Sequence, residues 1–274
     1  MTRIISLAMS KGGTGKTTCS INLASGLARG IGAVGQQQPR VLLIDIDPQA
    51  NSTAVFLSPE FALGPSDDKL TIYEVLVNQA PLMNAVYEVE LPENSRLGLS
   101  EAVIHLLPSH MRLARAELEL LGVLRREDRL AAMLKGIASQ YDYIIIDCPP
   151  SLGILTLNAL MASHEVLIPV EPGYFPLIGI GLVQQTIRDV SQINDLQLLG
   201  VIPTMQERTI EARETLDSLN GLFGNQVFPS IPSRVAVRNA HAAQMDIFTY
   251  ATDAASEDAA TAFAQLTERV AYGR

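Results

Sequence analysis

The chain has 274 residues, of which 47% are hydrophobic and 18% charged, so it can form a large core and is not expected to be disordered over most of its length. Its formal net charge of −9 excludes a strongly basic coat for nucleic acid, although a local basic patch can still bind phosphates. No apolar run reaches the roughly 18–20 residues of a membrane span, and the first run leads straight into glycines. We therefore expect a cytoplasmic protein without a signal peptide.

Two cysteines are present, Cys19 and Cys148, and neither belongs to a CxxC pair. This spacing argues against a disulfide scaffold and against a thiolate metal site, so we interpret both as small buried residues. The four histidines also lack the spacing of metal ligands.

Continuous apolar runs indicate the strands. They cover residues 3–9, 40–46, 103–108, 141–147, 165–170 and 196–203. Runs that are apolar on both faces are typical of a buried parallel sheet covered by helices. We therefore predict an α/β fold, a single domain over residues 1–274 with a mostly parallel, twisted sheet flanked by helices on both faces.

Helical periodicity fills the gaps between these runs. It covers residues 17–30, 178–194, 209–224 and 257–273, and residues 113–139 predict two helices interrupted at Gly122. Clusters of Gly, Pro and Asp predict loops at residues 30–39 and 58–69. No repeat, linker or second core is evident.

The segment SKGGTGKTT, residues 10–18, lies between the first predicted strand and helix. Glycines there let the backbone approach phosphates closely, and the helix directs its positive end at them. We expect Lys16 to neutralise the β- and γ-phosphates, Thr17 to offer its hydroxyl to Mg²⁺ and Thr18 to bind the α-phosphate. The rest of the predicted nucleotide loop is Lys11, Gly12, Gly13, Thr14 and Gly15. The loop makes the predicted α/β domain a single-domain P-loop NTPase.

The loop departs from the general pattern GxxxxGK[ST], because Ser10 replaces the first glycine and Lys11 is added. This variant resembles the deviant Walker A loop, KGGxGK[ST], of the ParA and MinD superfamily of ATPases. The resemblance implies that Lys11 crosses a dimer interface to the partner's nucleotide, where an added cation lowers the barrier to phosphoryl transfer. Dimerisation and catalysis would then be coupled. The alternative is that Lys11 is a solvated loop charge.

The segment DIDPQ places Asp45 and Asp47 on one face at the end of a predicted strand, where ligands gather in parallel sheets. The resemblance implies that this is the first switch, which includes Pro48. Asp47 would orient the attacking water or act as a general base, Asp45 would support the Mg²⁺ shell, and Asn51 would touch phosphate or partner. A cap of a helix or loop is the alternative for Asp45.

The segment YIIIDCPPSLG has the form of a Walker B strand that ends at Asp147. A carboxylate on a rigid buried strand suits metal coordination, so we expect Asp147 to hold Mg²⁺ through a water. Pro149 and Pro150 would stiffen the second switch, and Gly153 would give it room to respond to the γ-phosphate.

These motifs, together with LLPSHMRLARAELEL, VLIPVEP and SIPSRVAVRNA, follow in the order expected of ParA partition ATPases. The chain resembles the small, Soj-like kind, without an N-terminal helix-turn-helix domain, because the first strand begins at residue 3. The resemblance implies an ATPase that uses ATP and Mg²⁺, forms a homodimer when ATP is bound, binds DNA without sequence preference on the nucleoid, and is stimulated by a ParB-type partner during plasmid or chromosome segregation.

The resemblance also implies contacts in the C-terminal third. The adenine would lie near Thr204, Met205, Ile231 and Pro232. Phosphates of DNA would be contacted by Arg208, Arg213, Arg234 and Arg238, which gives salt-dependent binding with little base readout.

Other functions share parts of this pattern. A MinD-like membrane positioner should end in a basic amphipathic helix, which AQLTERVAYGR does not resemble. A ParA-like positioner of a protein cargo would use the same motifs. A metabolic enzyme resembling dethiobiotin synthetase conflicts with Lys11 and the DxDPQ segment together, and a nitrogenase-reductase-like protein needs cysteines that this chain lacks.

Overall fold

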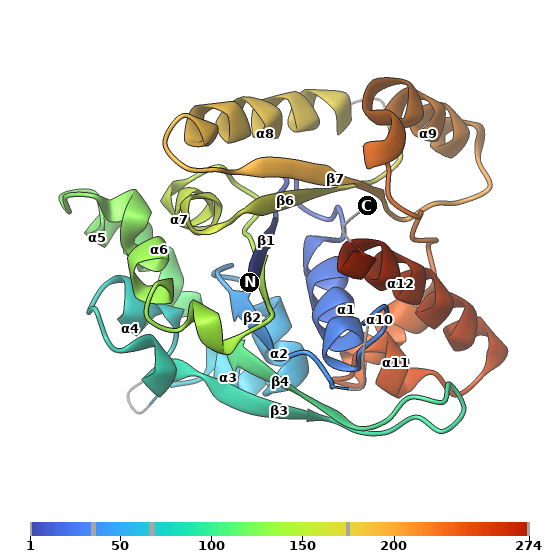
Figure 1. The fold of residues 1–274 in the computed structure, drawn as a ribbon, viewed down its shortest axis with the longest axis horizontal. Coiled ribbons are helices and arrows are strands. Elements are labelled where there is room, and N and C mark those ends of the chain that lie inside the picture. The colour runs from blue at the N-terminus through green and yellow to red at the C-terminus, as the bar shows by residue number, and fades with distance from the viewer. Residues whose placement is uncertain (1, 34–36, 66–68, 174–175, 273–274) are drawn as a thin grey trace.

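A seven-stranded sheet separates two layers of helices in the computed structural model, which describes residues 2–33, 37–65, 69–173 and 176–272 (Figure 1). The strands are β1 (Arg3–Leu7), β2 (Val41–Asp45), β3 (Tyr87–Leu91), β4 (Ala102–Leu107), β5 (Tyr143–Asp147), β6 (Glu165–Val170) and β7 (Gln197–Pro203). Their order is β3-β4-β2-β5-β1-β6-β7, and only β3, which is antiparallel to β4, departs from the parallel pattern. The predicted α/β fold is confirmed.

Helices cover both faces of this sheet (Figure 1). They are α1 (Lys16–Ala28), α2 (Asn51–Phe56), α3 (Pro59–Leu63), α4 (Ile72–Leu76), α5 (Ala116–Glu119), α6 (Arg129–Leu134), α7 (Ile154–Ala162), α8 (Pro176–Ser191), α9 (Ile210–Phe223), α10 (Val235–Ala242), α11 (Ile247–Tyr250) and α12 (Ala254–Tyr272). None of these described helices combines the length and the apolar character that crossing a membrane requires.

Alternate residues of the central strands enter two separate cores. On β2, Leu42 and Ile44 pack with α4, α6, α7 and α8, whereas Leu43 packs with α1, α11 and α12 on the other face. All three leucine and isoleucine side chains are fully buried. Burial on both faces explains why this strand is continuously apolar rather than alternating.

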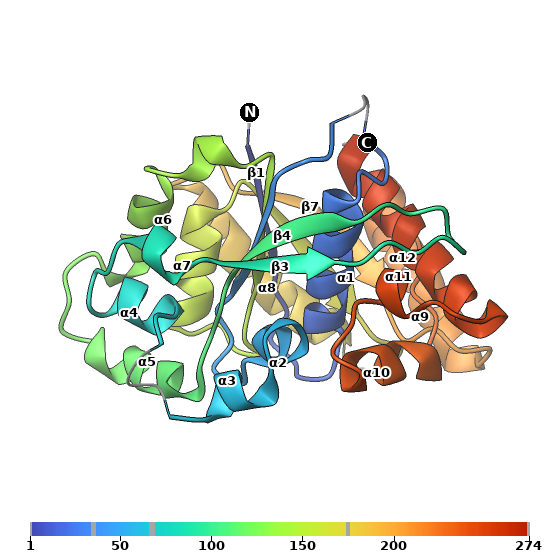
Figure 2. The same ribbon diagram turned by 90° about the horizontal axis from the view of Figure 1, so that it is seen from below.

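Strand register brings the functional segments together. In the parallel pairing, Asp147 at the end of β5 lies opposite Leu7 at the end of β1 and opposite Asp45 at the end of β2. The loop of residues 10–15 follows β1, so it leaves the sheet at this same edge, near α2, α3 and α10 (Figure 2). We call this the carboxyl edge, and the opposite edge, where β1, β2 and β5 begin, the amino edge.

Two of the structure's differences from the sequence prediction have local causes. β3 was not predicted: its run YEVEL alternates, because this antiparallel edge strand exposes Glu88 and Glu90 while burying its apolar residues. The predicted loop at residues 58–69 contains α3, which Ser58 caps by accepting a hydrogen bond from the Phe61 N–H at 3.0 Å.

The two helices predicted in residues 113–139 are shorter than expected. α5 has four residues and α6 has six, and the chain between them turns at Arg125, whose φ of 54° is left-handed. Helices α2, α4, α7, α10 and α11 were not predicted at all. Residues 34–36 of the predicted loop at 30–39, and 66–68 of the second loop, lie outside the described residues.

Candidate functional site

The loop between β1 and α1 has the backbone of an anion site. Gly13 and Gly15 have φ values of 79° and 86°, in the left-handed region that favours glycine. Gly15 is the N-cap of the 13-residue α1 and provides no side-chain cap, and no acidic residue occupies the first turn. The first N–H groups of α1 therefore have no side-chain acceptor, which suits a bound phosphate.

Lys16 brings a buried positive charge to this loop. Its residue is 6% exposed, and Nζ donates a hydrogen bond to the carbonyl of Lys11 at 3.0 Å. No carboxylate among the described residues lies within ion-pair distance of it. Desolvation lowers the pKa of Lys16, opposed by the nearby Asp147 carboxylate. A buried ammonium without an ion-pair partner is complementary to a phosphate group.

Asp147 is fully buried among hydroxyl groups. Ser52 Oγ donates to its Oδ2 at 2.7 Å and Ser20 Oγ to its Oδ1 at 3.2 Å, and Thr17 also hydrogen-bonds to the carboxylate. Burial raises the pKa of Asp147 to about 6. Carboxylate and hydroxyl oxygens suit Mg²⁺, so the structure brings together Thr17 and Asp147, two of the predicted metal-binding residues, in a fitting environment.

Asp45 is engaged by the backbone and hydroxyl of the first switch. Its Oδ2 accepts hydrogen bonds from the N–H and the hydroxyl of Thr53 at 2.9 and 2.8 Å, and its Oδ1 accepts from the N–H of Asp47 at 3.1 Å. The side chain is fully buried, and desolvation raises its pKa. These contacts favour the alternative that Asp45 caps this loop, and its support of the Mg²⁺ shell stays a prediction.

Asp47 adjoins Asp45 in the same hydrogen-bond network, since its N–H donates to the Asp45 carboxylate. It is 6% exposed, its Oδ1 accepts from the Gln49 N–H at 2.9 Å, and its carbonyl accepts from Ser109 Oγ at 2.7 Å. Desolvation raises the pKa of Asp47. A fixed backbone and a raised pKa are properties expected of a residue that orients or deprotonates water. Pro48 follows it directly in the turn that leads to α2.

Asn51 is exposed at the start of α2 and faces the phosphate loop. It shares a cavity of about 460 Å³ with Thr17 and Thr18, whose other wall includes His241 and Gln244 from the end of α10. The position agrees with the expectation that Asn51 touches a phosphate or a partner.

The second switch adjoins the same loop. Pro149 is buried, and a Cβ on Gly12 would lie 3.8 Å from the Cβ of Pro150, in ordinary contact. At Gly153 the φ of −76° needs no glycine, and the atom nearest to an added Cβ, at 2.5 Å, is a carboxylate oxygen at the end of the exposed Glu117 side chain, which can move aside. That Gly153 gives the second switch room to respond to the γ-phosphate therefore stays a prediction.

The four residues predicted near adenine do line one cavity, of about 100 Å³. Thr204, Met205, Ile231 and Pro232 lie there beside Gly15 and Thr18. The cavity forms because the chain after β7 bridges to residues 231–233, with the Gln206 N–H donating to the Ile231 carbonyl at 3.0 Å. Thr204 also ties it to the phosphate loop, since its Oγ1 donates to the Thr14 carbonyl at 2.8 Å.

The four predicted DNA-contacting arginines are exposed, but the structure divides them. Arg208 and Arg213 lie just before and within the first turn of α9. Arg234 and Arg238 lie at α10 and line the same cavity as the predicted adenine residues. Arg234 is also paired with Asp258, at 2.7 Å. The second pair therefore adjoins the nucleotide cavity, which the sequence did not indicate.

Lys11 is held within its own chain. Its side chain is 54% exposed, and its ammonium forms an ion pair with the carboxylate of Glu171, directly after β6. Sequence reasoning missed Glu171 as well as Ser20, Ser52, Thr53 and Ser109. The hydroxyl-rich run NST after DIDPQA was a signal for two of them; Glu171 had none, because its partner is 160 residues away.

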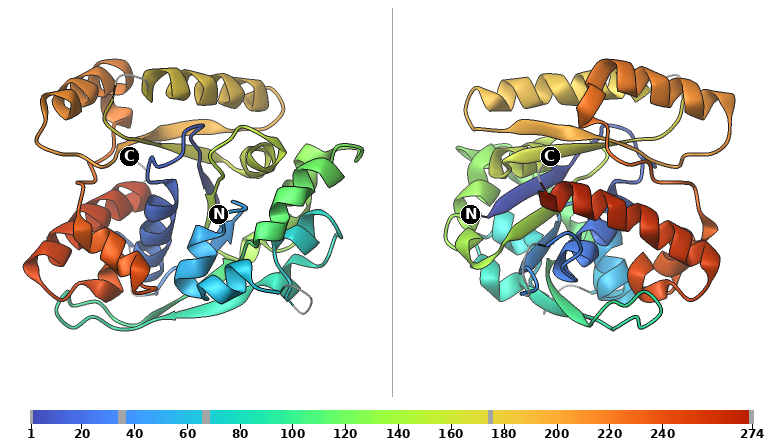
Figure 3. Two further views of the ribbon diagram at one scale, coloured as in Figure 1. Left: turned by 180° about the vertical axis from the view of Figure 1, so that it is seen from behind. Right: turned by 45° about the vertical axis from the view of Figure 1, so that its right-hand side comes forward.

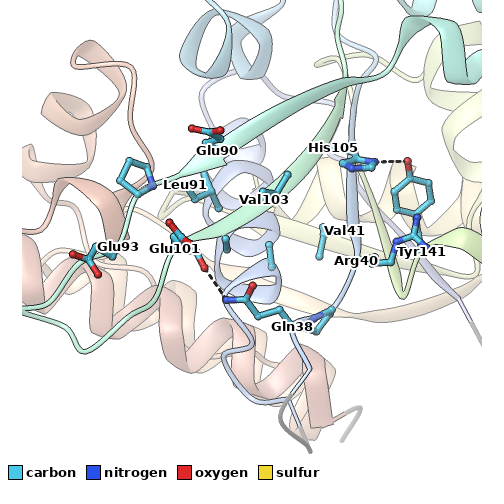
Figure 4. A pocket seen from close by; sticks show the side chains of 14 residues that line it. Gln38, Arg40, Val41, Glu90, Leu91, Glu93, Glu101, Val103, His105 and Tyr141 are labelled. Atoms are coloured by element: carbon cyan, nitrogen blue, oxygen red, sulfur yellow. Dashed lines mark hydrogen bonds between the residues drawn. The ribbon is translucent and has the colours of Figure 1, made fainter.

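A cavity of about 750 Å³, far larger than the one near Thr204, opens at the amino edge (Figure 4). Its wall contains exposed Val103 and the pair formed by His105 Nδ1 and the Tyr141 hydroxyl, 2.7 Å apart. Its carboxylates, on Glu90, Glu93 and Glu101, are solvent-exposed. It lies where β2 and β4 begin, whereas the phosphate loop lies at the opposite ends of the strands.

Comparisons with known proteins identify relatives that match most of the chain. A family model described as an AAA domain matches residues 2–198. The chain is 40% identical to the chromosome partitioning protein ParA of Myxococcus xanthus over 85% of this chain and 75% of the relative. It is 37% identical to the sporulation initiation inhibitor protein Soj of Bacillus subtilis, covering 91% of this chain and 92% of Soj. Among solved structures, cobyrinic acid a,c-diamide synthase of Mycobacterium smegmatis with a bound ATP analog and magnesium is 33% identical, with a TM-score of 0.71 over 89% of this chain and 94% of that one.

Proposed function

The chain belongs to the ParA and Soj family of chromosome partitioning proteins, and we propose that it is an ATPase that forms an ATP-bound dimer and binds DNA during segregation. The single observation that carries the proposal is the carboxyl edge itself. There the phosphate loop, the buried Lys16 and Asp147, and Asp47 converge from three strands. The M. smegmatis structure with an ATP analog and magnesium supports the choice of nucleotide and metal.

The residues divide the reaction between them. The N–H groups of the glycine loop and Lys16 would hold the phosphates, and Thr17 and Asp147 would hold Mg²⁺, which neutralises charge on the β- and γ-phosphates. Asp47 orients the attacking water for in-line displacement and accepts its proton. The backbone of Asp47 is fixed by Ser109 at 2.7 Å, so the carboxylate keeps its place relative to the loop.

Hydrolysis depends on a second copy in this proposal. Lys11 reaches the partner's nucleotide, where its ammonium stabilises the charge that develops on the γ-phosphate. The exposed side chain of Lys11 and the exposed Asn51 lie on the face that the second copy would cover. Arginines on α9 and α10 from both copies would contact DNA phosphates, and a ParB-type protein would stimulate hydrolysis on the nucleoid and release the dimer.

Two alternatives are less well supported. A membrane positioner needs a free amphipathic helix, but the apolar face of α12 is buried against α1, and a Cβ on Gly26 would lie 3.1 Å from Thr267 Cγ2 (Figure 3). A metabolic ligase, as the name of the M. smegmatis relative suggests, would turn over ATP without regard to DNA. A ParA-like positioner of a protein cargo would form the same dimer and would differ only in the cargo that it moves.

The test is to follow the oligomeric state and the DNA binding of wild type and Asp47→Ala with ATP and Mg²⁺. Without the water-orienting carboxylate, Asp47→Ala should accumulate as a dimer in size-exclusion chromatography with light scattering. The dimer should bind duplexes of unrelated sequence equally, with affinity that falls steeply as salt increases.

Three results would contradict the proposed function. A variant that stays monomeric with ATP would refute the assigned role of Asp47 and the dimer. Dimers that bind anionic vesicles but not DNA would favour the membrane alternative. A wild-type turnover that neither DNA nor a ParB-type protein changes would favour the metabolic one.

A further inference from the structure

Lys11 forms an ion pair with Glu171 of its own chain when no second copy is present. In the single chain, the ammonium of Lys11 is engaged by a carboxylate that follows β6. The same ammonium cannot bond to Glu171 and also extend to the phosphates of another copy. On the basis of the proposed function, we infer that Glu171 is a positioning residue that holds Lys11 back in the single protomer and sets the threshold at which ATP assembles the dimer.

Glu171 is placed firmly beside the phosphate loop. The carbonyl of its neighbour Val170 accepts a hydrogen bond from the Thr204 N–H at 2.8 Å, and Thr204 Oγ1 donates to the Thr14 carbonyl at 2.8 Å. The carboxylate side chain is only 20% exposed. Glu171 is thus fixed, whereas the half-exposed Lys11 is the member that can move.

The electrostatics of the loop explain why the pair forms and why ATP opposes it. Without a nucleotide, two ammonium groups lie within one short loop, and the Lys16 ammonium already bonds to the backbone carbonyl of Lys11. A carboxylate beside Lys11 offsets that positive charge. When a triphosphate fills the loop, the same carboxylate faces like charge, and Lys11 gains a stronger partner in the phosphates of the opposing copy.

Removing one Lys11–Glu171 pair should change the dimer dissociation constant modestly, and forming a symmetric dimer breaks two such pairs. An exposed ion pair changes an equilibrium by a factor of about three to five at most. A symmetric dimer separates two such pairs, so Glu171→Gln should lower the dimer dissociation constant by up to about tenfold in the presence of ATP and Mg²⁺. The ATP concentration that half-saturates turnover should fall with it, whereas turnover at saturating ATP should stay within about twofold, because Lys11 itself is intact.

A matched control is available on the next strand. Glu207 is exposed after the end of β7, at the same edge, and has no ion-pair partner among the described residues. Glu207→Gln removes the same charge from the same side of the molecule without touching Lys11. It should leave the dimer dissociation constant unchanged, which separates the specific pair from the general effect of net charge.

A second measurement tests the pair without any dimer. The sequence contains four lysines, Lys11, Lys16, Lys69 and Lys135, so ¹³C-methylated lysines give few NMR signals, which single lysine-to-arginine variants assign. In the nucleotide-free protein, Glu171→Gln should shift the Lys11 signal and Glu207→Gln should not. Thermal unfolding of both variants should match the wild type, because an exposed pair contributes little to the fold.

The outcomes separate this inference from the proposed function. If wild type dimerises with ATP but Glu171→Gln dimerises equally or more weakly, or if the Lys11 signal does not move, the restraining role of Glu171 is refuted while the family mechanism stands. If the Lys11 signal moves but wild type never dimerises with ATP, the pair is real and the proposed dimer cycle fails. A tighter dimer together with a shifted signal supports both.

Discussion

The carboxyl edge and the amino edge of the sheet differ in whether their charged side chains are buried. The carboxyl edge buries Asp45, Asp147, Lys16 and Asp47, each at most 6% exposed, around cavities of about 100 and 460 Å³. The amino edge has the larger space, about 750 Å³, but its carboxylates are in solvent. Burying charge is costly unless a partner compensates it, so charges retained in the interior point to a ligand more reliably than the size of a cavity does.

The comparison also explains why the carboxyl edge is rich in hydroxyl groups. Ser20, Ser52 and Thr17 satisfy Asp147, and Thr53 satisfies Asp45, so neither carboxylate requires a positive residue beside it. Neutral donors keep a buried carboxylate ionisable without neutralising it. At Asp147, the proposed Mg²⁺ residue, the negative charge therefore remains available to a cation that arrives with the nucleotide.

The strongest test of the carboxyl edge is Lys16→Ala. Removing a buried charge that contacts phosphates should weaken ATP binding by about 100-fold or more, and turnover should disappear with it. Isothermal titration calorimetry with a nonhydrolysable analogue measures the affinity. Lys135→Ala, at an exposed lysine, is the control and should bind as wild type does. Retained affinity in Lys16→Ala would remove the phosphate loop from the site.

Lys11→Ala should separate binding from turnover. Lys11 is half exposed, and in the proposed mechanism its ammonium acts on the partner's nucleotide. Affinity for ATP should therefore change by no more than about threefold, while turnover should fall by about 100-fold or more, as for other cations supplied in trans. A phosphate-release assay over a range of protein concentrations measures it. Equal turnover in Lys11→Ala and wild type would show that the lysine is only a solvated charge.

Asp147→Asn tests what burial of charge costs the apoprotein. Burial raises the pKa of Asp147 from its ordinary value of 3.8 to about 6, so between these values the folded state binds more protons than the unfolded state. The stability of wild type is therefore expected to fall as pH rises through that range. Asp147→Asn should be more stable by about 1–3 kcal/mol at pH 8 and near wild type at pH 4.

Chemical unfolding without nucleotide, at both pH values, checks this difference. Asp195→Asn, at an exposed aspartate, should show no gain at either pH. A loss of stability in Asp147→Asn at pH 8 would mean that the hydroxyl network favours the charge more than desolvation opposes it.

The smallest effect should come from the amino edge. Glu93→Gln changes an exposed carboxylate of the larger cavity and should alter ATP turnover and stability by amounts close to experimental error, about 0.5 kcal/mol or less. The same phosphate-release assay applies. A tenfold loss of turnover would show that the amino edge contributes to the reaction, which contradicts the assignment of the site to the carboxyl edge alone.

The sequence alone determined the features that depend on neighbours along the chain. All six continuous apolar runs are strands, and the phosphate loop lies between β1 and α1, because strand burial and a glycine-rich turn are local properties of short segments. The Thr17 and Asp147 pair also followed from motifs, since parallel strands must end at one edge.

Tertiary structure decided the features that depend on residues far apart. The hydrogen bonds from Thr53 engage Asp45 as a cap of the first switch, and those from Ser20 and Ser52 surround Asp147. The pair between Lys11 and Glu171 joins residues 160 positions apart. A motif specifies which groups are present, but a carboxylate's role is set by the donors around it, and those donors are brought there only when the whole sheet has formed.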